Sequence, residues 1–303
     1  MPSPYIVITA ANEKYRPLLL DLLNSLQKQR DALPFDIGVL DVGMSEATQR
    51  EIAANYGAIV KPAEADIDYP GRIKWEAEAF YYRTLTARPY LPRYFPGYQA
   101  YMWIDADAWV QTAEAMLVML KGAASEPAIY MVPELDRDYL PSSQHRLMQS
   151  VTWCKSFYGE DIANQMMGLP TLNAGVFAMR ADCPVWEAWG ALLTHSLRRY
   201  PEITRSHFMM DQVALNIAIF AGKYPLRPMP TEFNWLPILS IPVFDEATHD
   251  FWRPTPPRHT PISIIHLADD HKDGPMDFLT TTGEKRRRPL TFAATAAARD
   301  GAA

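Results

Sequence analysis

The stretch Tyr101-Met102-Trp103-Ile104-Asp105-Ala106-Asp107-Ala108-Trp109-Val110 decides the fold prediction, because a short apolar run in it ends in two carboxylates. A bounded apolar run of this length is typical of a buried strand. Residues two apart in an extended chain point the same way, so we expect Asp105 and Asp107 to share a face. Two carboxylates this close repel each other, which either raises one pKa or requires a cation such as Mg²⁺ or Mn²⁺. The alternative is a strand that runs into an acidic surface turn.

The composition is that of a globular protein with a full core. Of its 303 residues, 48% are hydrophobic and 21% charged, which are ordinary values. The net charge of -6 argues against nucleic acid as the main partner, since binding phosphates requires a basic face. Cys154 and Cys183 have no paired spacing, which predicts a reducing compartment and neither a disulfide framework nor a zinc cluster. Since the sequence shows neither a secretory signal nor an apolar run of about 20 residues, we expect a cytoplasmic enzyme with no transmembrane segment.

The N-terminal part of the chain alternates strand and helix patterns. Residues 5–9 and 35–40 are short, β-rich apolar runs that predict buried strands. A leucine stripe over residues 18–26 predicts a helix. A second helix is expected to begin after Ser45 as its N-cap and to stop at Gly57. This alternation predicts an α/β fold with a parallel sheet and crossover helices.

The later part of the chain is expected to contain longer helices and a loop-rich C-terminal region. We expect a helix over residues 73–86 and largely helical structure over residues 144–168. Residues 172–179 read as a small-residue turn that leads into a strand. Since no repeat or linker divides the chain, residues 1–282 are predicted to form one domain. The basic, alanine-rich end, residues 283–303, is predicted to be a flexible tail, with weak contact to an anionic membrane as the alternative.

The last predicted strand, residues 262–265, ends in a metal-competent side chain, His266. A lone histidine at a strand end is more often structural, but this one would supply the third ligand of an ion held by Asp105 and Asp107. A set of one histidine and two carboxylates suits Mn²⁺ better than Ca²⁺. Lys272 could place a positive charge over a phosphate, and its alternative is a solvated loop lysine.

These motifs belong to a longer ordered series of short segments. The series comprises Ala10-Ala11 with Tyr15, residues 39–45, Tyr82-Arg83, Ile104 to Asp107, Asn173 to Val176, Asp211 to Asn216, Phe233-Asn234-Trp235, and His266 with Lys272. In order and spacing, the series resembles the family 8 glycosyltransferases, which are retaining, metal-dependent enzymes that use nucleotide-sugars. The resemblance implies the GT-A fold, a Rossmann-like arrangement with a mostly parallel central sheet flanked by helices and a loop-rich C-terminal part.

The resemblance also implies a function for each matching position. Mn²⁺, or Mg²⁺, bound by Asp105, Asp107 and His266 would lie against the diphosphate of the donor. Asp211 and Gln212 would be the catalytic residues, holding sugar hydroxyls and the developing positive charge. The residues implied to contact the donor are Ala10 and Asn12 at the base, Tyr15 stacked on it, Arg83 at the sugar or diphosphate, Asn173 and Ala174 near the transferred sugar, and Lys272 at the leaving phosphate. Ala106 is also expected to be a donor-binding residue, because its small side chain lets another molecule come close.

The expected activity is transfer of a hexose from a nucleotide-sugar to a hydroxyl group of an acceptor. A UDP-sugar is the expected donor, and the acceptor is expected to be a glycan, a lipid-linked molecule or a small molecule. One alternative is an inverting enzyme on the same fold, with Glu134 or Asp136 as its base. Another is an inactive protein that binds sugar-nucleotides. The chain departs from the family pattern at Asp269, where a glycine is usual, and at Asp273-Gly274, where Pro-Trp is usual. An extra acid near a diphosphate is unfavourable unless it points away or reaches the metal. The presence of Asp269 therefore favours the inactive alternative.

Overall fold

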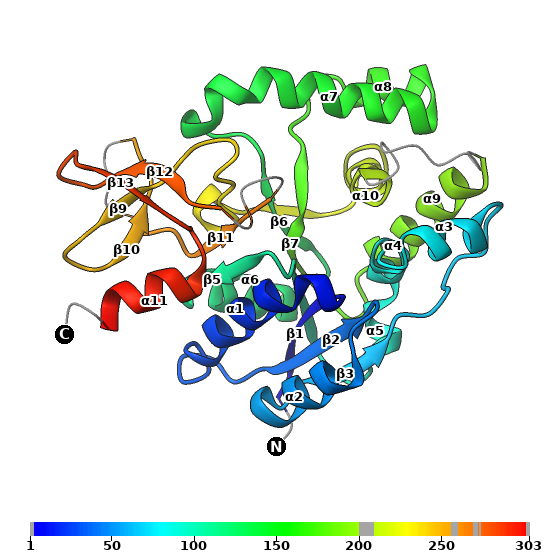
Figure 1. Ribbon diagram of the computed structural model, residues 1–303. Helices are drawn as coiled ribbons and strands as arrows, with labels where there is room; N and C mark the ends of the chain where they lie inside the picture. Colours follow the sequence, from blue (N-terminus) through cyan, green and yellow to red (C-terminus); the bar gives the residue numbers. More distant parts are fainter. Residues whose placement is uncertain (1–2, 200–208, 256–259, 269–271, 273, 301–303) are drawn as a thin grey trace.

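The computed structural model describes residues 3–199, 209–255, 260–268, 272 and 274–300 (Figure 1). A seven-stranded sheet lies at its centre. Its strands are β1 (Tyr5–Ala11), β2 (Asp36–Asp41), β3 (Ile59–Pro62), β4 (Ala100–Ile104), β6 (Ile129–Pro133), β7 (Leu172–Arg180) and β8 (Leu226–Pro228). They are arranged in the order β3-β2-β1-β4-β7-β6-β8.

The sheet is mostly parallel. Strands β3, β2, β1 and β4 are parallel to one another, and β6 is parallel to β8, whereas β7 is antiparallel to both β4 and β6. Because β7 runs the opposite way, its beginning lies beside the end of β4, and Val176 pairs with Ile104. The start of β7 and the residues after β4 therefore meet at one edge of the sheet.

Helices cover both faces of this sheet, which confirms the predicted α/β fold class. They are α1 (Arg16–Gln27), α2 (Glu46–Tyr56), α3 (Arg72–Glu78), α4 (Tyr82–Ala87), α5 (Leu91–Tyr94), α6 (Glu114–Ser125), α7 (Leu140–Tyr158), α8 (Glu160–Met166), α9 (Val185–Arg199), α10 (Met210–Ala221) and α11 (Phe292–Asp300). Short 3-10 helices are η1 (Glu13–Tyr15), η2 (Arg88–Tyr90), η3 (Arg137–Tyr139) and η5 (Thr231–Phe233).

The side chains of β1 show how the two layers of the core arise. Alternate strand residues point to opposite faces. Val7 packs in a cluster with residues of α1 and α6, whereas Ile6 and Ile8 pack in a cluster with residues of α9 and α10. A continuous apolar strand is thus explained by helices on both sides of it.

Local signals in the sequence account for several helix ends. The Ser45 side chain accepts a hydrogen bond from the backbone N–H of Thr48, and Gly57 has a φ of 63°, so both predicted caps of α2 are confirmed. The single helix predicted over residues 73–86 is interrupted, because Ala79 leaves the helical region with a φ of -153°. Gly159, with a φ of 88°, separates α7 from α8 within the segment predicted to be largely helical.

The chain turns between the two carboxylates of the opening stretch. Strand β4 ends at Ile104, and β5 (Ala108–Val110) begins after a turn in which the Ala108 N–H donates to the Asp105 carbonyl at 2.9 Å. The prediction that Asp105 and Asp107 share a face of one extended strand is therefore wrong. Strand β5 pairs with β11 (Ile264–His266), and this antiparallel pairing sets His266 opposite Ala108.

The C-terminal residues add a small layer beside β5 and β11. It consists of two hairpins, β9 (Val243–Asp245) with β10 (Asp250–Trp252) and β12 (Met276–Leu279) with β13 (Lys285–Arg288), followed by α11 (Figure 1). Phe292 is buried against Trp109, and the Trp109 indole N–H donates to the Leu290 carbonyl at 2.7 Å.

The flexible tail predicted from residue 283 is thus wrong over its described part, because apolar residues among the basic and alanine-rich ones anchor it. The single domain over residues 1–282 and the membrane contact of the tail stay predictions. Within the described ranges, every helix is too short or too polar to cross a membrane.

Candidate active site

Two carboxylates and an imidazole meet at the edge of the sheet. Asp105 and Asp107 come from the turn after β4, and His266 is the last residue of β11. The His266 Nε2 atom lies 3.6 Å from an Asp105 carboxylate oxygen and 3.3 Å from one of Asp107. One ligand atom from each residue falls within 4.8 Å of the others. The structure therefore brings together the residues that the sequence indicated as metal ligands.

A buried asparagine fixes the orientation of the imidazole. The Asn234 Oδ1 atom lies 3.0 Å from His266 Nδ1, and the Asn234 amide nitrogen donates to Asn173 Oδ1 at 2.9 Å. Because that nitrogen faces Asn173, the oxygen of Asn234 faces the imidazole and accepts the Nδ1 proton. The Nε2 atom then points at the carboxylates. This is the partner arrangement that a metal-ligating histidine needs, so the residues fit a divalent cation.

The electrostatics of the two carboxylates differ. Burial raises the pKa of Asp105, although Arg88 and His266 oppose that shift. Burial acts in the same way on Asp107, but His266 and Lys272 outweigh it and lower the pKa of Asp107 to about 2. The Lys272 ammonium lies 2.9 Å from the Asp107 carboxylate and donates to the Tyr15 hydroxyl at 2.9 Å. One of the two carboxyl pKa values is thus raised, as expected, but burial is the largest cause and the charge of Asp107 a smaller one.

A buried ion pair lies next to this cluster. Arg88, from η2, donates to the Asp211 carboxylate at the start of α10 and to the Ala174 carbonyl at 2.9 Å. The same guanidinium lies 3.7 Å from the Asp105 carboxylate. Burial raises the pKa of Asp211, and the charge of Arg88 opposes this. Gln212 is held as well, because its side-chain oxygen accepts from the Ala174 N–H at 2.9 Å.

Arg88, which the sequence did not indicate, lies where Arg83 was expected. Arg83 instead donates to the Glu76 carboxylate at 2.7 Å and to the Ala63 carbonyl at 3.0 Å. Arg83 does not line either of the two cavities described next, whereas Arg88 lines both. Five positions separate these arginines, and the helix break before α4 decides which of them faces the carboxylates. Neither the break nor that choice has a clear sequence signal.

Two cavities meet at the carboxylate–imidazole cluster. The first has a volume of about 290 Å³ and the second about 480 Å³, and they share Leu85, Arg88, Asp105, Asp107 and Lys272 as lining residues. The first is also lined by the predicted donor residues Ala10, Asn12, Tyr15 and Ala106. The second is also lined by Asn173, Asp211, Gln212 and His266. Ala174 contributes backbone groups to Arg88 and Gln212 and is not a lining residue of either cavity.

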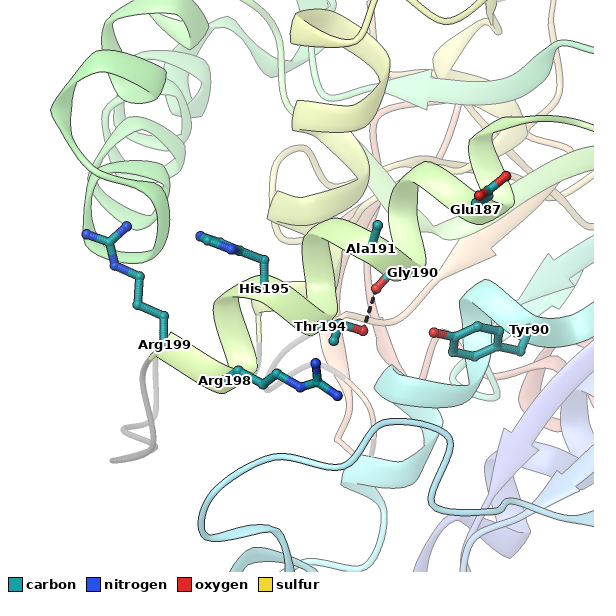
Figure 2. A pocket seen from close by; sticks show the side chains of 8 residues that line it. All are labelled: Tyr90, Glu187, Gly190, Ala191, Thr194, His195, Arg198 and Arg199. Atoms are coloured by element: carbon teal, nitrogen blue, oxygen red, sulfur yellow. Dashed lines mark hydrogen bonds between the residues drawn. The ribbon is translucent and has the colours of Figure 1, made fainter.

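A larger surface hollow of about 750 Å³ lies along α9, between that helix and Tyr90 (Figure 2). It has no lining residue in common with the two cavities at the carboxylates. Asp269 and Asp273, where the sequence departs from the family pattern, lie outside the described residues.

A side chain on Gly175 would collide with the imidazole. A Cβ atom there would lie 2.2 Å from His266 Cε1 and 2.9 Å from Asn173 Oδ1. Gly175→Ala is therefore expected to push His266 from the carboxylates and to weaken Mn²⁺ binding at least tenfold. Overpacking of this kind also costs about 1–3 kcal/mol of stability. Titration of Mn²⁺ followed by electron paramagnetic resonance checks the binding, and an unchanged affinity would contradict the position given to His266.

Loss of the asparagine partner should loosen the imidazole. Asn234 is fully buried, and its oxygen accepts the Nδ1 proton of His266. Removal of such a partner typically costs about 10–100-fold in metal affinity. Asn234→Ala is expected to weaken Mn²⁺ binding by that amount in the same titration. Wild-type affinity in a folded variant would show that the histidine needs no partner.

The fold agrees with that of solved glycosyltransferases. The chain matches the galactosyltransferase LgtC in complex with donor and acceptor sugar analogs, with a TM-score of 0.57 and 16% identity over 98% of this chain and 95% of that one. It matches an active-site mutant of LgtC with a TM-score of 0.52 and 15% identity, over the same 98% and 95%. It matches the bifunctional glycosyltransferase WbbM, in its apo structure, with a TM-score of 0.54 and 14% identity over 89% of this chain and 46% of that one.

No protein-family model matches the sequence, and no curated protein matches it either. At such low identity, the similarity to solved structures concerns the fold. The mixed sheet with its flanking helices is accordingly the predicted GT-A fold, the fold of these glycosyltransferases.

Proposed function

We propose that the protein is a metal-dependent, retaining glycosyltransferase that moves a hexose from a UDP-sugar to a hydroxyl acceptor. The observation that carries the proposal is the cluster of Asp105, Asp107 and His266 at the meeting point of two cavities. One cavity would hold the nucleotide, and the other the transferred sugar and the acceptor. The diphosphate that joins nucleotide and sugar would then lie at the cluster itself.

The first cavity suits a nucleotide base. The Tyr15 ring lines it, with the Lys272 ammonium 5.2 Å from the ring centroid. The Asn12 side chain accepts from the Tyr15 N–H at 3.1 Å, which fixes the backbone beside the ring. An aromatic face next to a cation supports stacking of a base and contact with its phosphates.

The residues at the boundary would stabilise departure of the nucleoside diphosphate. A divalent cation held by Asp105, Asp107 and His266 would neutralise charge that grows on the leaving diphosphate. Lys272, which lies beside Asp107, adds a second positive charge there. Both positive charges would lie where negative charge develops on the leaving diphosphate. Electrostatic stabilisation by such preorganised groups is usually a large part of catalysis.

The second cavity suits the sugar. Asp211 and Gln212 line it and are held in place by Arg88 and by the backbone of β7. As the bond between the sugar carbon and the diphosphate breaks, the carbon becomes oxocarbenium-like, and a fixed carboxylate nearby favours it. In the retaining reaction the acceptor oxygen bonds to the same face of that carbon, and its proton goes to the leaving phosphate.

An inverting reaction is the second candidate, because Glu134 lines the second cavity. One of its carboxylate oxygens accepts from Asn173 at 2.9 Å. The other is buried, has no hydrogen-bond partner in the part of the chain that the structure describes, and lies 3.7 Å from Arg146 Nε. Asp136 instead accepts from Arg253 and Thr231 and does not line the cavity. Glu134 is therefore the base that an inverting enzyme would use. The anomeric configuration of the product, read by NMR, separates the two reactions.

Two measurements test the proposed function. The first is calorimetry of UDP binding in the presence and absence of Mn²⁺, and the second is an assay of UDP-sugar hydrolysis. We expect Mn²⁺ to strengthen UDP binding and the protein to cleave at least one UDP-sugar. Binding without turnover would favour the inactive sugar-nucleotide binder. Failure of Mn²⁺ to affect UDP binding would contradict the proposal. The cytoplasmic location remains a prediction.

A further inference from the structure

One helix, α7, builds a wall of the second cavity. Arg146, Gln149 and Trp153 of this helix line the cavity, which has a volume of about 480 Å³. Residues spaced three and four apart lie on one face of a helix, so these side chains form a single stripe. The helix lies above α10 in Figure 1 and is in contact with it, and α10 carries Gln212, which lines the same cavity. No function proposed above uses this stripe.

The stripe contains an aromatic side chain in a supported position. Trp153 is half-buried, because one part of it packs against the core while another lines the cavity. An aromatic side chain brings a large apolar area with few rotatable bonds, so it provides a firm contact surface. The flat C–H face of a sugar ring is an apolar surface of matching size.

Polar groups line the same cavity as this aromatic ring. Arg146 donates to the Gln149 side-chain oxygen at 3.4 Å and lies 3.7 Å from the carboxylate of Glu134. Among the described residues, the second carboxylate oxygen of Glu134 has no hydrogen-bond partner, although Glu134 is only 6% exposed. An unsatisfied buried oxygen costs free energy, and a ligand hydroxyl would relieve that cost. The guanidinium and carboxylate also balance each other, which favours an uncharged ligand.

We propose that the stripe on α7 selects the acceptor: the ring of a sugar acceptor stacks on Trp153, and its hydroxyls bind Gln149, Arg146 and Glu134. This inference rests on the proposed transferase function, because it names residues that bind the acceptor of that reaction. A mostly apolar wall would suit an alkyl chain, and a wholly charged wall would suit an anion. An aromatic ring beside several donors and acceptors suits a sugar with many hydroxyls. The stripe on α7 would thus determine acceptor specificity.

Saturation-transfer difference NMR tests the inference directly. The ligands are methyl β-D-galactopyranoside, methyl β-D-glucopyranoside and methyl α-D-mannopyranoside, each added to protein with UDP and Mg²⁺, since Mn²⁺ broadens the signals. N-acetylserine amide and glycerol serve as hydroxyl compounds without a sugar ring. We expect at least one glycoside to bind the wild type, with the other two compounds giving no comparable signal. Absence of glycoside binding, or equal binding of the compounds without a ring, would overturn the inference.

Variants of α7 locate the binding. Trp153→Ala and Gln149→Ala are expected to weaken glycoside binding at least tenfold, whereas Trp153→Phe retains most of it because an aromatic face remains. Met148→Ala changes an exposed residue that does not line the cavity and is the matched control. Wild-type glycoside affinity in both Trp153→Ala and Gln149→Ala would overturn the inference.

UDP-sugar hydrolysis in the same variants keeps this test separate from that of the transferase function. Hydrolysis with water needs no acceptor, so the wild type and the control variant Met148→Ala should hydrolyse the donor at the same rate, whether or not a glycoside is bound. If the wild type hydrolyses no donor but binds a glycoside through Trp153, the transferase proposal fails and the carbohydrate site remains. If the wild type hydrolyses a donor but the α7 variants bind the glycoside with wild-type affinity, the transferase proposal remains and the acceptor inference fails.

Discussion

Asp107→Asn is expected to weaken UDP binding about 100-fold in the presence of Mn²⁺, and to leave UDP binding without metal nearly unchanged. A factor of 100 corresponds to about 2.7 kcal/mol. The reason is that Asp107 is ionised over a wide pH range, since His266 and Lys272 lower its pKa to about 2 against the opposing effect of burial. Its oxygen faces the other ligand atoms, and an amide replaces a charged ligand with a neutral one. Isothermal titration calorimetry with UDP, with and without Mn²⁺, measures both affinities.

Asp31→Asn is the control for this variant, because Asp31 is exposed and lines neither cavity. It should bind UDP and Mn²⁺ as the wild type does. If the Asp107→Asn variant folds and keeps its Mn²⁺-stimulated affinity, Asp107 is not a metal ligand.

Arg88→Met is expected to destabilise the protein by about 3–5 kcal/mol, because it leaves the buried carboxylate of Asp211 without its charged partner. Only 7% of the Arg88 side chain and 1% of the Asp211 side chain are exposed, so water cannot replace the lost contact. Methionine keeps much of the apolar stem that lies near the Trp103 ring. Urea unfolding followed by circular dichroism measures the change in the free energy of unfolding.

Two further variants identify the cause of that change. Arg50 forms an exposed ion pair with Glu46, so Arg50→Met should alter stability by no more than about 0.5 kcal/mol. The double variant Arg88→Met with Asp211→Asn removes the unpaired charge and should recover part of the lost stability. If the double variant is as unstable as Arg88→Met, the loss comes from packing and not from an unpaired carboxylate.

The cluster of Asp105, Asp107 and His266 could be predicted from the sequence because its members end apolar runs. Asp105 and Asp107 follow a buried strand, and His266 ends another. Residues at the ends of strands in such sheets are favourable candidates for ligands. The turn between the carboxylates was not predicted, because β5 leaves the direction of β4 to pair with β11, a partner more than 150 residues later. Such a pairing has no local signal.

Other parts of the site depend on contacts that only the fold creates. Asn234 lay within a quoted motif but had no assigned position, and its contact with His266 joins a 3-10 helix end to a strand. Arg88 was missed because it follows a helix break at Ala79. Neither a proline nor a glycine stands at that position to signal the break. The stripe on α7 was missed because helical periodicity shows which residues share a face, but not that this face borders a cavity.

Anomalous X-ray scattering at the manganese edge, from crystals soaked with Mn²⁺ and UDP, tests the central claim most directly. The account predicts one strong peak per chain, bonded to carboxylate oxygens of Asp105 and Asp107 and to Nε2 of His266, with the diphosphate of UDP against it. A peak that omits His266, or manganese bound elsewhere while this cluster stays empty, would contradict the account.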